Sequence, residues 1–184
     1  MSDRPLKRKY ARIERERRFL LECLPEQVEE QDYERLHDRY IQGAPLRLRR
    51  VEKPTGEPIL TKLGQKLLNP DEPNNPRHRM MTTLYLTPKE GTLFEVLPAH
   101  SSTKRRYKLK EQGWTFVIDC YEAPASVKGL LIAEVECDTD EALEAIQCPE
   151  WAVREVTDEP QWSGARLAAG EVPPFAKRRS EVDS

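Results

Sequence analysis

The sequence predicts an α+β fold, mainly β, in which antiparallel strands close into a barrel and helices pack on the outside. Six segments alternate charged with apolar residues at the two-residue period of a β-strand. Three of these segments carry carboxylates on one face, and three carry cations. Two further segments have the start signals of a helix. A chain of 184 residues suits one domain of this kind.

The charged faces of the six segments differ in sign from strand to strand. The carboxylates are Glu14 and Glu16 within residues 13–19, Asp119 within 115–121, and Glu134 and Glu136 within 131–137. The cations are Arg47 and Arg49 within 45–51, Lys62 within 58–64, and Lys104 and Arg106 within 103–109. Arg18 shares the face of Glu14 and Glu16.

A single strand of this type is typical of a half-buried antiparallel sheet whose charged face meets water. Six such strands with sorted signs favour a closed sheet whose charged faces point inward. The barrel would then enclose a lumen with acidic and basic walls, and its apolar outer faces would need helices as cover. This arrangement also explains why 34% of the residues are charged while the net charge is only -2.

Two helices are predicted by their N-terminal signals. Thr87 and Glu90 form a capping box with Pro88 at the first helical position, which predicts a helix over residues 88–97. Further along, Asp138 or Thr139 is the expected N-cap of a helix that ends near residues 148–149.

The remaining segments divide into short elements and ends. Weaker signals predict a short helix within residues 25–36 and a final helical turn within 151–167, and residues 70–79 are expected to form a loop. The predicted domain organisation is a flexible N-terminus at 1–9, a folded domain at 10–168 and a flexible tail at 169–184.

Composition excludes several classes of function. Lys and Arg total 30 against 32 Asp and Glu, so the chain has no basic excess for binding nucleic acid or an anionic membrane. No apolar run approaches the roughly 18 residues that span a bilayer, and the N-terminus lacks the apolar region of a secretory signal. The four cysteines are widely spaced, which favours reduced thiols in a cytoplasmic protein over a disulfide framework or zinc site. The oligomeric state is left open.

The lumen's residue types indicate a metal and a polyanion. Clustered carboxylates without His or Cys prefer hard cations, here Mg²⁺ or Mn²⁺. Arginines two residues apart on one strand present parallel forks to an anion, and the guanidinium group matches phosphate bidentately. Together they indicate a di- or triphosphate bound with metal. A P-loop is excluded because the chain has only 8 glycines and no GxxxxGK[ST] motif.

A family resemblance starts at the same residues. The segment Glu14-Arg15-Glu16-Arg17-Arg18 resembles the ExExK signature of the CYTH superfamily, also called triphosphate tunnel metalloenzymes. More of the family's pattern follows in order over residues 10–168: Leu46-Arg47-Leu48-Arg49, Leu60-Thr61-Lys62, Lys104-Arg105-Arg106-Tyr107, and Ala133-Glu134-Val135-Glu136. Two positions depart from the pattern. Arg18 replaces the usual lysine, and Trp162-Ser163-Gly164 stands where related chains carry a YSN-like segment.

The resemblance implies an eight-stranded antiparallel barrel that forms a tunnel, with helices outside. It also implies hydrolysis or transfer at a triphosphate with a divalent metal, Mg²⁺ or Mn²⁺. Glu14, Glu16, Asp119, Glu134 and Glu136 would hold metal, and Glu14, Glu16 and Arg18 would be the catalytic residues. The phosphates would be bound by Arg18, Arg47, Arg49, Lys62, Lys104 and Arg106.

The first functional hypothesis is therefore a metal-dependent phosphohydrolase acting on a small-molecule triphosphate, with inorganic triphosphate as the expected substrate. A class IV adenylyl cyclase or a thiamine or nucleoside triphosphatase of the same fold is the alternative. A non-catalytic module that binds polyphosphate or nucleotide is the alternative from another class. Five clustered carboxylates favour catalysis, because they repel one another unless metal or cations neutralise them.

Overall fold

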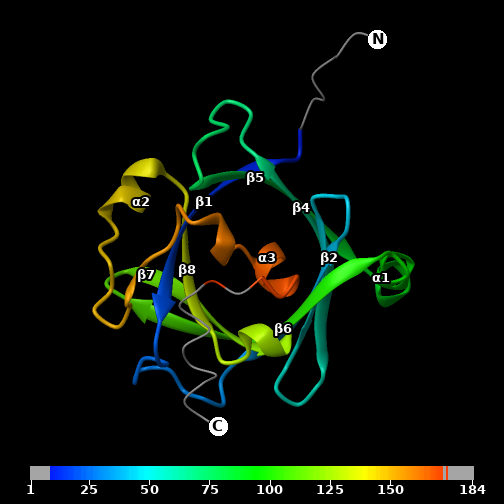
Figure 1. Cartoon of the computed structure of the whole chain (residues 1–184), viewed down its shortest axis with the longest axis horizontal. Coiled ribbons are helices and arrows are strands. Elements are labelled where there is room, and N and C mark those ends of the chain that lie inside the picture. Colours follow the sequence, from blue (N-terminus) through cyan, green and yellow to red (C-terminus); the bar gives the residue numbers. More distant parts are fainter. Residues whose placement is uncertain (1–8, 172, 174–184) are drawn as a thin grey trace.

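The computed structural model describes residues 9–171 and 173, which form a closed β-barrel with helices around and across it (Figure 1). The strands are β1 (Arg12–Leu21), β2 (Glu34–Ile41), β3 (Leu46–Glu52), β4 (Pro58–Leu68), β5 (His78–Leu86), β6 (Ala99–Glu111), β7 (Trp114–Ala123), β8 (Leu131–Cys137) and β9 (Arg154–Glu155). The α-helices are α1 (Pro88–Glu95), α2 (Asp140–Ala145) and α3 (Gly164–Ala168), and the 3-10 turns are η1 (Ala125–Val127) and η2 (Pro160–Trp162).

Eight of the strands form the barrel. Their order is β5-β4-β3-β2-β6-β7-β8-β1, and β1 pairs with β5 to close the ring. The pairings are antiparallel throughout. Strand β1 is shared between three neighbours, because its first residues pair with β5, its later residues with β8, and Phe19 and Leu20 also with β9. The predicted eight-stranded antiparallel barrel is confirmed.

The main hydrophobic core lies outside the barrel wall. Phe19, Tyr107, Phe116, Ile118 and Val135 alternate with the inward charged residues of β1, β6, β7 and β8, and all are buried. Helix α2 and the loops around residues 24–33 and 146–152 cover this outer face. The predicted arrangement of apolar outer faces under helical and loop cover is therefore present in this half of the barrel.

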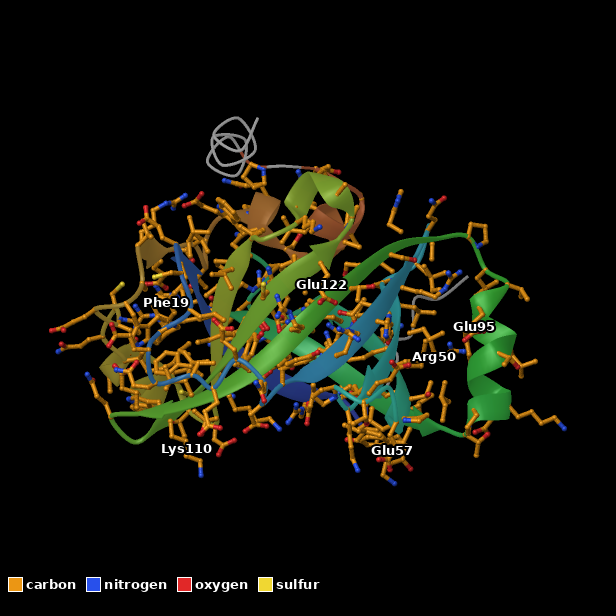
Figure 2. The ribbon with its side chains drawn as sticks, turned by 90° about the horizontal axis from the view of Figure 1, so that it is seen from below. Phe19, Arg50, Glu57, Glu95, Lys110 and Glu122 are labelled. Carbon is orange, nitrogen blue, oxygen red and sulfur yellow. The ribbon has the colours of Figure 1, made fainter. Side chains whose placement is uncertain are left out.

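Helix α1 packs on the outside of the barrel against β3, β4 and β5. Thr87 accepts a hydrogen bond from the Glu90 backbone N–H, and the Glu90 carboxylate accepts one from the Thr87 backbone N–H, so the predicted capping box is present. An ion pair between Arg50 on β3 and Glu95 links the end of α1 to the barrel (Figure 2). Helix α1 begins at the predicted residue and ends two residues before the predicted end.

Helix α2 is shorter than predicted. Thr139 is its N-cap, as expected, but the helix ends at Ala145 because Ile146 adopts an extended backbone and is buried in the outer core. The Arg17 guanidinium donates to the carbonyl oxygens of Leu143 and Ile146, which satisfies acceptors at this helix end. Burial of Ile146 therefore overrides continuation of the helix.

The predicted helix within residues 25–36 is wrong. Residues 25–32 form turns, and strand β2 begins at Glu34. Strand β2 fills the gap between β3 and β6, and its eight residues pair with β6. The backbone bonds to two neighbouring strands outweigh a weak helical period. The predicted loop at 70–79 agrees with the structure except that His78 and Arg79 already belong to β5.

The chain's last described elements close one end of the barrel. Residues 160–168, here called the C-terminal plug, comprise η2 and α3, and α3 lies across the ring in Figure 1. Trp162 and Leu167 of the plug pack with Leu20, Tyr121 and Ile132 from the strands. The predicted final helical turn within 151–167 corresponds to this plug.

The predicted flexible ends, 1–9 and 169–184, lie largely outside the described residues and stay predictions. Arg166 in α3 is exposed and pairs with Glu171 at 3.2 Å. Among the described helices, none has the length and apolar character needed to cross a membrane.

Candidate active site

A cavity of about 740 Å³ occupies the barrel interior. Its charged lining comes from six strands: Glu14, Glu16 and Arg18 of β1, Arg47 and Arg49 of β3, Lys66 of β4, Arg79 of β5, Lys104 and Arg106 of β6, and Glu134 and Glu136 of β8. The inward orientation follows from the strand period, since these residues alternate with the residues of the outer core. Nine of the site residues predicted from sequence therefore border one cavity.

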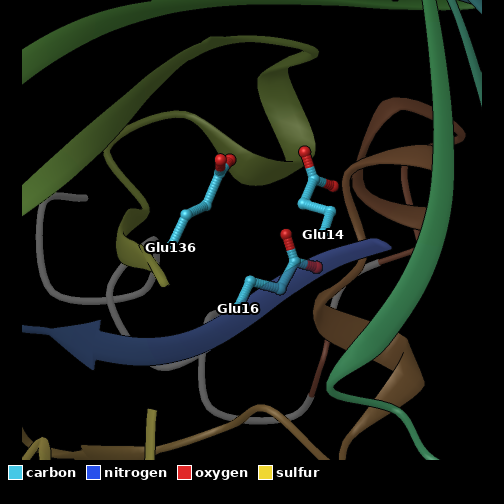
Figure 3. A group of neighbouring side chains, drawn as sticks. All are labelled: Glu14, Glu16 and Glu136. Atoms are coloured by element: carbon cyan, nitrogen blue, oxygen red, sulfur yellow. The ribbon is translucent and has the colours of Figure 1, made fainter. Parts of the chain in front are cut away.

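Three carboxylates gather at one part of this cavity. Glu14, Glu16 and Glu136 each offer an oxygen, and these oxygens lie within 4.8 Å of one another (Figure 3). Glu16 on β1 and Glu136 on β8 are direct cross-strand partners, which brings their side chains together on the inner face. Three converging carboxylate oxygens are the donor type that hard divalent cations prefer, so this cluster fits Mg²⁺ or Mn²⁺.

Lys66 neutralises part of this cluster. Its Nζ lies 2.7 Å from a Glu14 oxygen and 2.8 Å from a Glu16 oxygen. Lys66 was not predicted as a site residue. Strand periodicity could have indicated it, because Lys66 lies four residues after Lys62 and so shares its inward face.

The three clustered carboxyls have different electrostatic surroundings. Burial opposes ionisation of Glu14, but the charge and hydrogen bond of Lys66 lower its pKa below the usual value. Burial raises the pKa of Glu136, and the neighbouring carboxylates of Glu14, Glu134 and Glu16 raise it further. Glu136 has only Arg12, at 3.9 Å, as an ion-pair partner within the described chain. A cation placed at this cluster would therefore relieve the repulsion acting on Glu136.

The other two predicted metal residues have cationic partners in the structure. Asp119 receives two hydrogen bonds of 2.7 Å from Arg106 and is paired with Lys104. Glu134 accepts a hydrogen bond of 3.1 Å from Arg18 and lies 3.5 Å from Arg106. Cationic neighbours hold the pKa of both carboxyls below the usual range, although burial opposes ionisation. The structure thus separates the predicted acidic set into a cluster of three and a pair held by cations.

Arg18 connects these two groups of acids. Its guanidinium forms ion pairs with Glu16 and with Glu134. Both partners are fixed on neighbouring strands, so the Arg18 side chain is held between the carboxylate cluster and the ion-paired layer. Arg18 uses Nε and one Nη in these two ion pairs, and its other N–H groups can donate to an anion in the cavity that it borders.

Arg49 also forms an ion pair with a carboxylate. Asp38 of β2 accepts two hydrogen bonds from Arg49, of 2.6 and 2.7 Å, and both residues are buried. The pKa of Asp38 is far below its usual value because Arg49 and Arg47 outweigh the effect of burial. Asp38 was missed as a site residue because its strand was partly assigned to a helix. It shares its face with Leu36 and Tyr40, so a correct strand assignment would have placed it inward.

Three inward-facing cations have no close ion pair with a carboxylate among the described residues. Arg47 lies 3.9 Å from Asp38, and Arg79 donates to the backbone carbonyls of Asn75 and His78. Lys62 has no ion-pair partner within the described chain, and its pKa is lowered by burial and by Arg49, Arg47 and Arg106. These cations have hydrogen-bonding capacity to spare for an anion. Lys62 and Asp119 face inward but do not border the 740 Å³ cavity.

One edge of the cavity is apolar. The β2–β3 turn with its flanking strand ends, strand β5 and the C-terminal plug supply it, and its residues are Ile41, Ala44, Pro45, Leu46, Met81, Pro160 and Ala165. This set is called the apolar rim below. A cavity of this size falls in the range of roughly 300 to 1,000 Å³ that holds drug-sized ligands. The cavity thus combines a charged wall with a smaller apolar surface.

Neither a protein-family model nor a curated protein sequence gives a significant match to the chain. Among the solved structures that share its fold are two crystal structures of NE1496, described once as a hypothetical protein and once as an inorganic triphosphatase. Each aligns with a TM-score of 0.54 at 21% sequence identity and covers 84% of this chain, and the alignments cover 97% and 93% of the NE1496 chains. This likeness establishes the fold. The shared fold is a closed antiparallel barrel, which agrees with the barrel predicted from the sequence.

Proposed function

We propose that the chain hydrolyses a triphosphate with a divalent metal inside this cavity, and that inorganic triphosphate is its substrate. One observation carries the proposal: three converging carboxylates and a wall of arginines and lysines border the same cavity. The carboxylates fit a hard cation, and the cations fit phosphate oxygens. The fold shared with the inorganic triphosphatase NE1496 supports the same function at the level of architecture.

The three-carboxylate cluster is proposed to hold Mg²⁺ or Mn²⁺ through Glu14, Glu16 and Glu136. Bound there, the metal would neutralise phosphate charge and lower the pKa of a water molecule. Lys66 limits repulsion within the cluster when no metal is bound, since it lies between Glu14 and Glu16. Asp119 and Glu134 are assigned a supporting role, because they hold Arg106 and Arg18 in place.

The phosphate chain is proposed to lie along the cations. Arg47 and Arg79 border the cavity without a close carboxylate partner and are the first ligands in this proposal, with Arg18 and Arg106 presenting N–H groups beside them. Lys62 faces inward without bordering the cavity, and it contributes positive potential. Arg49 and Lys104 contribute positive potential from within their ion pairs. Cations aimed at the transferring group stabilise charge on its oxygens, which is the main catalytic demand of phosphoryl transfer.

A second candidate is an organic triphosphatase or a class IV adenylyl cyclase. The apolar rim favours it, because a bare triphosphate offers nothing for Ile41, Leu46 and Met81 to contact. An organic group attached to the triphosphate could lie on this rim while the phosphates remain on the charged wall. The non-catalytic binding module is disfavoured by the repulsion between Glu136 and the neighbouring carboxylates, which raises the energy of a protein that never binds metal.

A phosphate-release screen tests the proposed function. The purified chain would be offered inorganic triphosphate, pyrophosphate, ATP and thiamine triphosphate, each with Mg²⁺, with Mn²⁺ or with EDTA. We expect metal-dependent release of phosphate from inorganic triphosphate and none in EDTA. Turnover that persists in EDTA would contradict the metal assignment. Conversion of ATP to cyclic AMP would favour the cyclase, and binding without turnover of any substrate would favour the binding module.

A further inference from the structure

A glycine of the C-terminal plug touches a tyrosine that borders the cavity. Gly164 is the first residue of α3, and Tyr40 faces inward from β2. A methyl group at position 164 would overlap the Tyr40 Oη and would lie 3.1 Å from Cζ. Gly164 is not one of the glycines with positive φ, and alanine is the better helix former. The close approach of Tyr40, and not the backbone conformation, therefore requires glycine here.

Tyr40 in turn contacts a proposed phosphate ligand. It is the cross-strand partner of Arg47, so the two side chains lie next to each other on the inner face. Burial opposes the charge on Arg47, but Asp38 and the Tyr40 hydroxyl beside the guanidinium raise the pKa of Arg47 above its usual value. Its nearest carboxylate oxygen, on Asp38, is 3.9 Å away, whereas Arg49 makes two short bonds to the same acid. Tyr40 is thus the neighbour that orients Arg47.

The plug has less freedom to move than the tyrosine. Trp162 and Leu167, on either side of Gly164, are 2% and 0% exposed and pack with Leu20 and Ile132. Displacing α3 would open this packed cluster, at the cost of buried contacts. Tyr40 borders open cavity space instead. A side chain at position 164 would therefore push the phenol into the cavity and away from Arg47.

We infer that Gly164 is a positioning residue for triphosphate binding, because its missing side chain lets the Tyr40 phenol hold Arg47 against the phosphate site. This inference rests on the proposed function, which makes Arg47 a phosphate ligand. It assigns the plug a second role besides closing the barrel end. The plug sets the position of a charged group on strand β3 through its contact with Tyr40.

A double-mutant cycle tests the inference. Binding of inorganic triphosphate in EDTA would be measured by titration calorimetry for wild type, Gly164→Ala, Tyr40→Phe and the double variant. We expect Gly164→Ala to weaken binding roughly tenfold, the loss of one hydrogen bond to a charged group. In the Tyr40→Phe background, Gly164→Ala should weaken triphosphate binding by less than about twofold. The nearest ring atom is then Cζ at 3.1 Å, and small shifts relieve that contact. With Mg²⁺ present, KM should rise while kcat stays close to wild type.

A matched glycine controls for general damage to a helix. Gly91 in α1 is also helical, and a methyl group there would lie 3.1 Å from Thr61 Cγ2. Gly91→Ala should leave triphosphate binding unchanged, because α1 packs on the outside of the barrel. Thermal unfolding of every variant would be recorded beside the titrations.

Each outcome of the cycle decides the inference. Equal losses in both backgrounds, or wild-type binding by Gly164→Ala, would overturn it. If Gly164→Ala fails to fold and the double variant folds, the contact through Tyr40 is supported, and if both fail to fold it is overturned. Wild-type binding without turnover would reject hydrolysis but leave the cycle interpretable. A wild-type chain that does not bind inorganic triphosphate would reject both claims.

Discussion

Glu16 on β1 and Glu136 on β8 lie directly opposite each other on the inner face of the barrel, with ligand oxygens within 4.8 Å. Like charges in directly opposed positions destabilise a sheet. Lys66 and Arg18 offset the charge of Glu16, whereas among the described residues only the more distant Arg12 forms an ion pair with Glu136. The pair is therefore arranged at an energetic cost that a divalent cation would remove.

Replacing Glu136 with Gln should stabilise the metal-free protein and inactivate the enzyme. The pKa of Glu136 is above its usual value, so the folded state binds more protons than the unfolded state, and stability falls as the pH rises through this window. At neutral pH the ionised Glu136 is unfavourable. In EDTA we expect a rise in Tm on the order of one to two degrees, because the half-exposed side chain is screened by water. Activity with Mg²⁺ should fall on the order of 10²-fold.

Glu16→Gln is the matched control for that experiment. Glu16 is 2% exposed and ion-paired, so its loss leaves Lys66 and Arg18 short of a partner. This variant should lose activity as well, but its Tm in EDTA should fall. Addition of Mg²⁺ should raise the Tm of wild type more than that of either variant. Near-full turnover in both variants at saturating Mg²⁺ would contradict the metal site.

Removal of Arg49 should mainly lower stability, whereas removal of Arg47 should mainly weaken triphosphate binding, although both residues were predicted as phosphate ligands. Arg49→Ala removes both short hydrogen bonds to the buried Asp38 carboxylate and leaves it with Lys104 at 3.7 Å and Arg47 at 3.9 Å, so we expect the free energy of unfolding to drop by about 3 kcal/mol. Arg47→Ala should leave stability nearly unchanged and weaken triphosphate binding roughly tenfold or more. Urea unfolding and titration calorimetry measure the two effects. Equal losses of stability in both variants would show that the Asp38–Arg49 pair is not the structural one.

Triphosphate binding should weaken at alkaline pH because of Lys62. Burial and the three neighbouring arginines lower its pKa below the usual value of 10.5, so its positive charge is lost at a lower pH than that of a free lysine. The dissociation constant for inorganic triphosphate in EDTA should therefore rise with pH above neutrality. Lys62→Arg keeps the charge over the whole range and should flatten this rise. An equally steep rise in the variant would assign the titration to another group.

The sequence predicted the barrel because its information lies in strand periodicity, which is local and repeats in six segments. Strand β2 was not predicted, because its inward face mixes apolar Leu36 with charged Asp38 and so alternates only weakly. The pairing with β3 and β6 that stabilises β2 is not visible from the segment itself. The end of α2 was predicted wrongly for a similar reason. It depends on burial of Ile146 and on Arg17, which is more than 120 residues away in the sequence.

The candidate site was predicted as a set of inward charges but not as pairs. Periodicity placed Asp119 and Glu134 on the same faces as the cluster residues, yet their partners depend on barrel register, which no single strand reveals. Register sets Asp119 opposite Arg106, and it sets Glu134 opposite Arg18. Those pairings divide the acids between the three-carboxylate cluster and the ion-paired group. Lys66 was within reach of the same periodic reasoning once β4 was extended to its full length. Arg79 was not, because β5 was absent from the six predicted segments and residue 79 was assigned to a loop.

Substrate preference should separate the charged wall from the apolar rim. A bare triphosphate is contacted by cations from several strands, so we expect its kcat/KM to exceed that of ATP by roughly tenfold or more, a difference of about 1.4 kcal/mol in the barrier. Pyrophosphate should be poor, because it is too short to reach both the cations and the carboxylate cluster. A competition among the three substrates at equal concentration with excess Mg²⁺ measures this order.

Leu46→Asn then shows whether the apolar rim binds an organic group. Leu46 borders the cavity at the start of β3 and belongs to the rim, one residue before Arg47. If inorganic triphosphate is the substrate, this change should leave its KM within about twofold, since the phosphates lie on the charged wall. An organic triphosphate whose apolar group rests on the rim would lose affinity through a higher KM at unchanged kcat, because the rim contact is the same in the ground and transition states. A preference for ATP or thiamine triphosphate that disappears in Leu46→Asn would therefore transfer the assignment to an organic triphosphate.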